Sequence, residues 1–192
     1  FSFGYYAQMP LSKVGIEKIA IEIKSFIRYK MRGALKCYFV DLDNTLIPGV
    51  WEEDKESIVE EYQKPSSGSF HSLKMFLKKQ ASYGAQVIIV SKNDHSSIIE
   101  ALECIDRNWH QWITHIDSGW GVKHERINQM IIQIGISAED SLIVDANPIE
   151  IGSIEEYLPL ANRQLFKNNF QHFVRDLKSK GLYLFGNASF NE

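Results

Sequence analysis

Two aspartates two positions apart stand at the end of an apolar segment. Asp41 and Asp43 follow residues 37–40, a Cys-Tyr-Phe-Val run that favours a buried strand. Side chains of an extended chain alternate, so both carboxylates lean the same way if the strand geometry persists, and Leu42 turns to the core. Two carboxylates held together repel unless a cation lies between them. The pair therefore predicts a divalent cation, and Mg²⁺ suits oxygen ligands and phosphate substrates.

Such a pair can supply a nucleophile to phosphorus and a proton donor and acceptor. Three other segments offer groups for the same chemistry. Ser91 and Asn93 follow a second apolar run and provide a hydroxyl and loop amides for phosphate oxygens. Lys123 begins a helix and brings a point charge, and Asp145 ends a third apolar run, where it can complete a metal site. Taken alone, each of these residues is more simply explained as part of a turn, a helix cap or a solvated lysine. The interpretation depends on all of them standing next to predicted strand ends or a helix start.

The elements that position these groups follow from an alternation of short apolar runs with amphipathic segments, the pattern of βαβ units around a parallel sheet. In such a sheet ligands bind beyond the carboxyl ends of the strands, so Asp41, Ser91 and Asp145 are expected to meet in one crevice. The strands are predicted at residues 37–40, 87–90 and 142–144, and the helices at about residues 12–29, 70–83, 96–104 and 123–134.

The length of 192 residues, of which 44% are hydrophobic, predicts one domain over residues 1–192. Its core is expected at about residues 35–160, with an N-terminal helix at 12–30 and a C-terminal helix at about 168–180. The segment between Thr45 and Phe70 is too short for a separate cap domain, which needs at least ~50 residues. We therefore expect an open site without a large cap.

The charge balance excludes some classes of protein. The chain has 21 Lys and Arg against 24 Asp and Glu, a net charge of −3, which argues against a nucleic-acid partner or a membrane surface. No apolar run approaches the ~20 residues that cross a bilayer. Cys37 and Cys104 lack the spacing of a zinc site or a disulfide scaffold, which fits a reducing compartment. We expect a soluble, cytoplasmic protein and, because Phe1 is not a methionine, a piece of a longer chain or a trimmed one.

The order of an Asp pair, Ser, Lys and Asp resembles the haloacid dehalogenase superfamily of aspartate-nucleophile phosphotransferases. This resemblance implies a Rossmann-like, three-layer αβα fold with a parallel central sheet. The sequence is more narrowly similar to the FkbH-like branch, the glyceryl transferase/phosphatase domains of polyketide assembly lines. The narrower likeness rests on the DLDNTL run at residues 41–46, SKND at 91–94, WxxK at 120–123 and NPxE at 147–150.

The branch implies a reaction. Its members take a glyceryl group from 1,3-bisphosphoglycerate, remove phosphate and deliver the acyl group to the phosphopantetheine thiol of an acyl carrier protein, as parts of a larger polyketide synthase. By the resemblance, Asp41 is the nucleophile and Asp43 the acid/base, and both contribute to the Mg²⁺ site with Asp145, Asp43 through its main-chain carbonyl. The phosphate clamp consists of Ser91, Asn93 and Lys123.

Two features depart from this scheme or complicate it. Ala146 stands where the superfamily usually has a second acidic residue, which implies a weaker hold on Mg²⁺. Acyl transfer needs a thiol or a direct handover, but Cys37 lies four residues before Asp41, ~13 Å along an extended strand. We therefore interpret Cys37 as a buried strand residue and Cys104 as a packing residue. A small-molecule phosphomonoesterase and a degenerate, non-enzymatic binding domain remain alternatives to the transferase.

Overall fold

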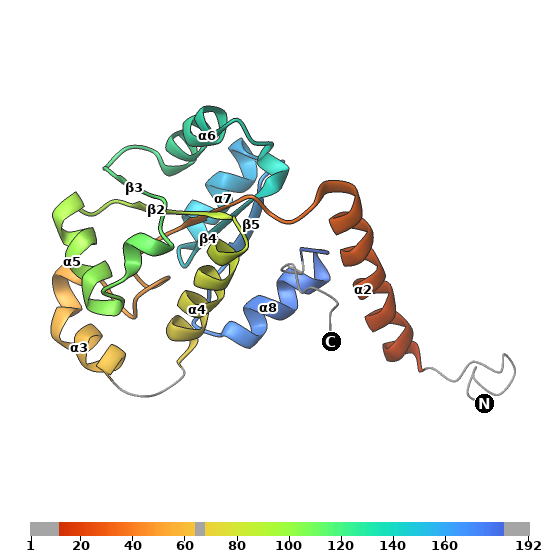
Figure 1. Cartoon of the computed structure of the whole chain (residues 1–192), viewed down its shortest axis with the longest axis horizontal. Helices are drawn as coiled ribbons and strands as arrows, with labels where there is room; N and C mark the ends of the chain where they lie inside the picture. The colour runs from red at the N-terminus through yellow and green to blue at the C-terminus, as the bar shows by residue number, and fades with distance from the viewer. Residues whose placement is uncertain (1–11, 64–67, 183–192) are drawn as a thin grey trace, which may run out of the picture.

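The central layer is a five-stranded parallel sheet with the strand order β3-β2-β1-β4-β5 (Figure 1). The computed structural model describes residues 12–63 and 68–182, so the two ends of the expected domain lie outside the described residues. The predicted α/β fold with a parallel sheet is confirmed. The strands are β1 (Cys37–Val40), β2 (Gln86–Ser91), β3 (His115–Ser118), β4 (Ser141–Asp145) and β5 (Asn162–Leu165).

Helices flank this sheet, and several carry local signals at their ends. Ser12 caps the first described helix by accepting a hydrogen bond from the Gly15 N–H. Gly135 ends another helix in the left-handed conformation, with φ of 73°. The helices are α2 (Lys13–Arg32), α3 (Trp51–Gln63), α4 (Ser69–Ser82), α5 (His95–Ile105), α6 (Lys123–Ile134), α7 (Pro148–Tyr157) and α8 (Phe170–Ser179).

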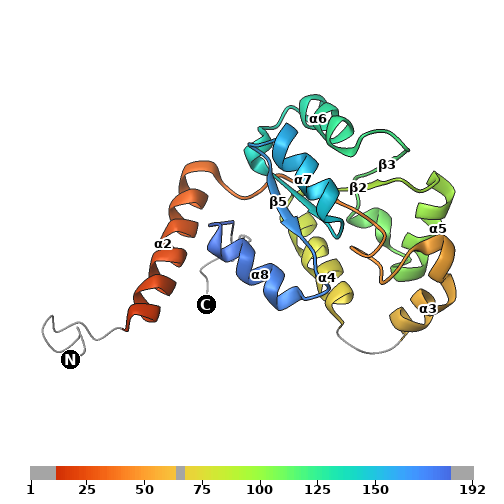
Figure 2. The same cartoon turned by 180° about the vertical axis from the view of Figure 1, so that it is seen from behind.

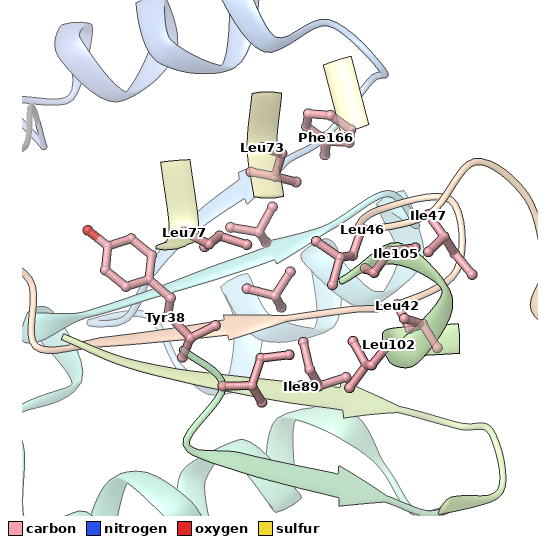
Figure 3. Close-up of a cluster of buried hydrophobic side chains, with 14 of the residues drawn as sticks. Tyr38, Leu42, Leu46, Ile47, Leu73, Leu77, Ile89, Leu102, Ile105 and Phe166 are labelled. Carbon is pink, nitrogen blue, oxygen red and sulfur yellow. The ribbon is translucent and has the colours of Figure 1, made fainter. Parts of the chain in front are cut away.

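The strand alternation divides the core into two layers. Tyr38 and Val40 of β1 face a larger apolar cluster, which residues of α4, α5 and α8 complete. Figure 3 shows part of this cluster, with Tyr38 on the same side of the sheet as Leu73 and Leu77 of α4. Cys37 and Phe39 face a second cluster on the opposite side of the sheet, where α6 and α7 pack. Because β1 is central and both its faces are covered, its four residues are all buried. This three-layer packing fixes the ends of the strands, from which the polar loops emerge.

Helix α3 takes the place where a cap domain would be inserted. It lies between β1 and α4, with residues 64–67 outside the described part of the chain, and Trp51 and Ile58 pack into the core. No large cap domain is present among the described residues. Sequence analysis did not predict this helix.

Helix α2 extends away from the layered body in both views (Figures 1 and 2). It approaches α8, where Glu22 and Lys178 lie 3.6 Å apart. The helically spaced Ile19, Ile23 and Ile27 are exposed rather than packed. Within residues 12–63 and 68–182, the structure has no helix with the length and apolar character needed to cross a membrane.

Candidate active site

The predicted polar residues meet at the carboxyl edge of the sheet. Asp41 follows β1, while Ser91 and Asp145 end β2 and β4, the two strands that pair with β1. All of these strands are parallel, so their ends lie side by side. Lys123, the first residue of α6, reaches the same place and donates hydrogen bonds to Asp41 and Asp145. Asp41, Asp145 and Lys123 are therefore brought together by contact, and Ser91 ends the neighbouring strand at the same edge of the sheet.

The chain turns sharply after β1. The N–H groups of Leu46 and Ile47 donate to the Leu42 carbonyl at 2.9 and 3.0 Å, which closes a tight turn over residues 42–47, just after Asp41. Asn44 adopts φ of 55°, a left-handed conformation that Asn tolerates better than most residues. Leu42 is fully buried in the same apolar cluster as Leu46 and Ile47, and its side chain lies beside Leu102 (Figure 3). The buried Leu42 side chain thus anchors a loop that presents Asp41 and Asp43 at the sheet edge.

Lys123 bridges two carboxylates in a nearly dry environment. Its Nζ lies 2.8 Å from Asp41 Oδ1 and 2.6 Å from Asp145 Oδ2. Asp145 and Lys123 are 1% and 4% exposed. Burial alone would lower the pKa of Lys123, but attraction by both aspartates raises it above its ordinary value. The lysine is therefore a fixed positive charge at this site.

The carboxyl of Asp41 is the strongly perturbed acid of the site. Burial, followed by repulsion from Asp145 and Asp43, raises its pKa to about 7, although Lys123 opposes the shift. Two carboxylates sharing one ammonium leave an excess negative charge. Perturbation of this kind by burial and specific charges is typical of functional sites.

Asp43 lies differently from the expected pairing of carboxylates around one cation. Its Oδ1 accepts a hydrogen bond from the Trp51 N–H at 3.0 Å, and its Oδ2 accepts one from the Asn93 side-chain amide at 2.8 Å. The turn after Asp41 ends the strand alternation, so the two carboxylates have different partners. Asn93, which we predicted to bind phosphate, contacts Asp43 in this structure. The Ser91 hydroxyl accepts a hydrogen bond from the Asn93 N–H at 3.2 Å.

Thr45 is a member of the site that sequence analysis missed. Its hydroxyl donates to Asp41 Oδ2 at 3.3 Å and accepts a hydrogen bond from the Ala146 N–H at 2.9 Å. Thr45 is fully buried and connects the loops that follow β1 and β4. Its place in the same short motif as Asp41, four residues on, was the signal available in the sequence.

Arg126 is a second missed residue, and it holds the loop that leads to Lys123. It donates to Asp117 Oδ2 at 2.8 Å, to the Ser91 carbonyl at 3.2 Å and to the Gly119 carbonyl. These bonds join β2, β3 and the start of α6. Arg126 therefore fixes the position from which the Lys123 side chain reaches Asp41.

The oxygen atoms at the crevice fit Mg²⁺ in chemical type. Asp41 and Asp145 provide two carboxylates, which suit a small hard cation, and Mg²⁺ often binds one or two carboxylates while keeping several waters. No group of three or more His, Cys, Asp or Glu side chains among the described residues is arranged to hold a metal. Ala146 supplies a methyl group where a third carboxylate was expected. The side-chain donor set is thus two carboxylates.

The two cysteines lie where packing explains them. Cys37 is fully buried, and burial raises the pKa of its thiol to about 12. Cys104 is half-buried on α5, and burial raises its pKa as well. The thiolate is the nucleophilic form of cysteine, so neither environment activates the side chain. The interpretation of both as structural residues is consistent with these surroundings.

Comparisons with known proteins give matches among solved structures, whereas no family model and no curated protein matches the chain. The N-terminal part of the protein BF1531 from Bacteroides fragilis, which contains a phosphatase domain complexed with Mg, superposes with a TM-score of 0.75 and 22% identity. The match covers 97% of this chain and 50% of that one, so this chain spans half of its length.

A second similar structure is 3-deoxy-D-manno-octulosonate 8-phosphate phosphatase from Moraxella catarrhalis, in complex with magnesium, phosphate and KDO. It has a TM-score of 0.51 and 13% identity, over 85% of this chain and 90% of that one. At these identities the likeness establishes the fold. The chain has the Rossmann-like αβα fold that the motif order implied for a haloacid dehalogenase-type protein.

Proposed function

We propose that this chain is a Mg²⁺-dependent phosphoryl-transfer enzyme of the haloacid dehalogenase type, with Asp41 as its nucleophile. The observation that carries the proposal is the arrangement of Asp41 and Asp145 around Lys123 at the carboxyl edge of the sheet. Both structures compared above are phosphatases or contain a phosphatase domain, and both hold magnesium. That shared chemistry supports extending the same reaction class to this crevice.

The residues divide the reaction between them. An oxygen of Asp41 attacks phosphorus as the bond from phosphorus to the leaving oxygen breaks, and Asp43 gives that oxygen a proton. Asp43 then takes a proton from the water that hydrolyses the aspartyl phosphate, which regenerates Asp41 and releases phosphate. The Thr45 hydroxyl accepts a hydrogen bond from the Ala146 N–H, so its own proton is directed to Asp41. This hydrogen bond orients the Asp41 carboxylate.

Charge compensation falls to Lys123 and the metal. Lys123 stays protonated and holds the Asp41 and Asp145 carboxylates toward the crevice. Mg²⁺, held by those two carboxylates and the main-chain carbonyl of Asp43, would offset the repulsion between phosphate and Asp41. The Ser91 hydroxyl and the loop amides after β2 remain the proposed partners of the phosphate oxygens.

The finer proposal is that the enzyme transfers a glyceryl group from 1,3-bisphosphoglycerate to the phosphopantetheine thiol of an acyl carrier protein, with removal of phosphate. Its support is the similarity of residues 41–46, 91–94, 120–123 and 147–150 to the FkbH-like branch. The absence of a large cap among the described residues is compatible with a substrate carried on a protein. A docked carrier would itself exclude water from the crevice and raise the effective concentration of its thiol.

The decisive experiment incubates the protein with Mg²⁺, 1,3-bisphosphoglycerate and candidate carriers and measures each carrier by intact-protein mass spectrometry. We expect a dephosphorylated glyceryl adduct on the holo carrier and none on the apo carrier. The Asp41→Asn variant is the control for phosphate removal. An unmodified cognate holo carrier, combined with efficient hydrolysis of small phosphate esters, would replace the transferase by the phosphomonoesterase. Absence of both reactions would favour a binding domain that has lost catalysis.

A further inference from the structure

An ion pair joins the segment that follows β2 to the start of α7. Lys92 directly follows Ser91 at the end of β2, and Glu150 lies in the first turn of α7, just after β4. Lys92 Nζ and Glu150 Oε1 are 2.5 Å apart. Since β1 lies between β2 and β4, this contact joins segments on either side of β1, two strand spacings or ~10 Å apart. The ion pair therefore lies beyond the carboxyl end of β1, where Asp41 is placed.

Lys92 and Lys123 differ in how readily their ammonium groups can bind a ligand. Lys123 is buried and bonded to both Asp41 and Asp145. The Lys92 side chain is 47% exposed and has the long flexible stem that lets an ammonium change partners. Arg126, the nearest cation of the adjoining loop, is engaged by Asp117 and two carbonyls. Lys92 is thus the side chain that can offer positive charge to an incoming anion at little cost.

Glu150 has the opposite character. Its side chain is only 14% exposed and sits in the first turn of α7, where the partial positive charge of the helix end favours a carboxylate. The acid therefore stays in place while the exposed lysine is exchangeable. A half-exposed ion pair is weak, so an anionic group of a ligand competes with it effectively.

We propose that Lys92 binds a second anionic group of the substrate, separate from the phosphoryl group that Asp41 attacks, and that Glu150 holds Lys92 over the crevice until that group replaces it. The substrate class is a phosphate ester or acyl phosphate that also has a carboxylate or a second phosphate. This inference rests on the proposed phosphoryl-transfer function and deepens it. It assigns the recognition of the substrate's remote end to the pair Lys92 and Glu150.

The test compares two ligands that share a phosphate and differ in one remote group, glycerol 3-phosphate and 3-phosphoglycerate. Binding is measured by calorimetry with Mg²⁺ on the Asp41→Asn background, so that no turnover occurs. The quantity of interest is the preference for the carboxylate ligand, the ratio of the two dissociation constants. We expect Lys92→Met to lower this preference at least tenfold, and Glu150→Gln to raise it about threefold by freeing the lysine.

Lys78→Met is the matched control, because Lys78 forms a similar ion pair at the other end of the sheet. Its Nζ lies 2.6 Å from Asp106 Oδ2, and its side chain is 35% exposed. It should leave the preference unchanged. Equal weakening of both ligands by Lys92→Met, or no change in either, would overturn the inference while leaving the phosphate site intact. Failure of both ligands to bind the Lys92-containing protein would instead remove the proposed function and, with it, this inference.

Discussion

Asp41 and Asp106 are carboxylates at opposite ends of the sheet, and their surroundings shift their pKa values in opposite directions. Asp41 lies beyond β1, where burial and neighbouring carboxylates raise its pKa to about 7. Asp106 ends α5 on the side where the strands begin. Burial alone would raise its pKa, but hydrogen bonds from Lys78, the Asn108 N–H and the Trp112 indole lower it.

The difference separates a carboxylate whose charge the fold satisfies from one whose charge it leaves only partly compensated. Asp106 has enough donors to stabilise its charge without any ligand, so it strengthens the fold. Asp41 and Asp145 share Lys123 and keep an excess negative charge, which a cation or a protonated state relieves. Binding of a cation beside Asp41 and Asp145 would therefore stabilise this region. Such a need for positive charge is expected of a metal-assisted phosphate site.

The largest expected effect comes from Asp41→Asn. Loss of the proposed nucleophile should reduce phosphate release by at least about 10⁴-fold, because Asp41 is the group that we assign to the covalent intermediate. The fold should remain intact. A pKa raised from 3.8 to about 7 means that the folded state binds the extra proton, so ionisation of Asp41 lowers stability as the pH rises between these values.

In buffer at pH 8 with a chelator, the Asp41→Asn protein should therefore have a higher melting temperature than the wild type. Phosphate release with Mg²⁺ and thermal unfolding without it provide the two measurements. Turnover like that of the wild type in a pure preparation would rule out the mechanism. A lower melting temperature would contradict the contrast between Asp41 and Asp106.

Removal of the shared lysine should have the next largest effect. Lys123→Met leaves the buried Asp145 and the partly buried Asp41 without their shared cation, a change that costs about 3–5 kcal/mol when one partner of a buried pair is lost. Lys78→Met at the other end of the sheet should cost about 1 kcal/mol or less, because that ion pair is partly exposed. Urea denaturation of both variants at pH 7.5 without metal measures the difference. Equal losses in the free energy of unfolding would mean that the two lysine ion pairs contribute equally to stability, whatever their burial.

Asp106→Asn should remove stability that depends on pH. Because the pKa of Asp106 is lowered below 3.8 by folding, its contribution is fully present above that value and disappears as the pH falls through the lower, folded-state pKa. We expect a loss of about 1–2 kcal/mol at pH 7 from weakened hydrogen bonds to a charged group, and a smaller gap near pH 3. Denaturation curves at both pH values test this. A gap that grows on acidification would reverse the assigned sign.

The sequence predicted the parts of the fold that are buried on both sides. Strands β1, β2 and β4 are continuous apolar runs because both of their faces are covered. The two outer strands, β3 with the sequence His-Ile-Asp-Ser and β5 with Asn-Arg-Gln-Leu, were missed because each is partly exposed and has no apolar run. Helix α3 was missed since few of its residues face the core.

The residues of the candidate site likewise fall into those that the sequence predicts and those that it does not. The convergence of Asp41, Lys123 and Asp145 was predictable, because each stands next to a strand end or helix start that the apolar pattern locates. The bridge made by Thr45 and the ion pair of Lys92 depend on how loops from different strands meet. Contacts of that kind leave no periodic signal in the sequence.

An effect on packing alone, with activity nearly unchanged, is expected from Cys37→Ala, which tests the amino end of the same strand that presents Asp41. Cys37 is fully buried against Phe39 and the helices of its layer, so loss of its sulfur should cost about 1–2 kcal/mol through reduced packing. Since burial raises the pKa of the thiol to about 12, it is neutral at pH 7, and phosphate release and carrier loading should stay within about twofold of the wild type.

Chemical denaturation and intact-mass analysis of a candidate carrier measure these two quantities on the same preparation. Cys104→Ala is the matched control, because Cys104 is half-buried on α5. Complete loss of carrier loading in a folded Cys37→Ala protein, with loading preserved in Cys104→Ala, would make Cys37 the acyl acceptor. Reactive side chains would then lie at both ends of β1, and our assignment of Cys37 to packing alone would be wrong.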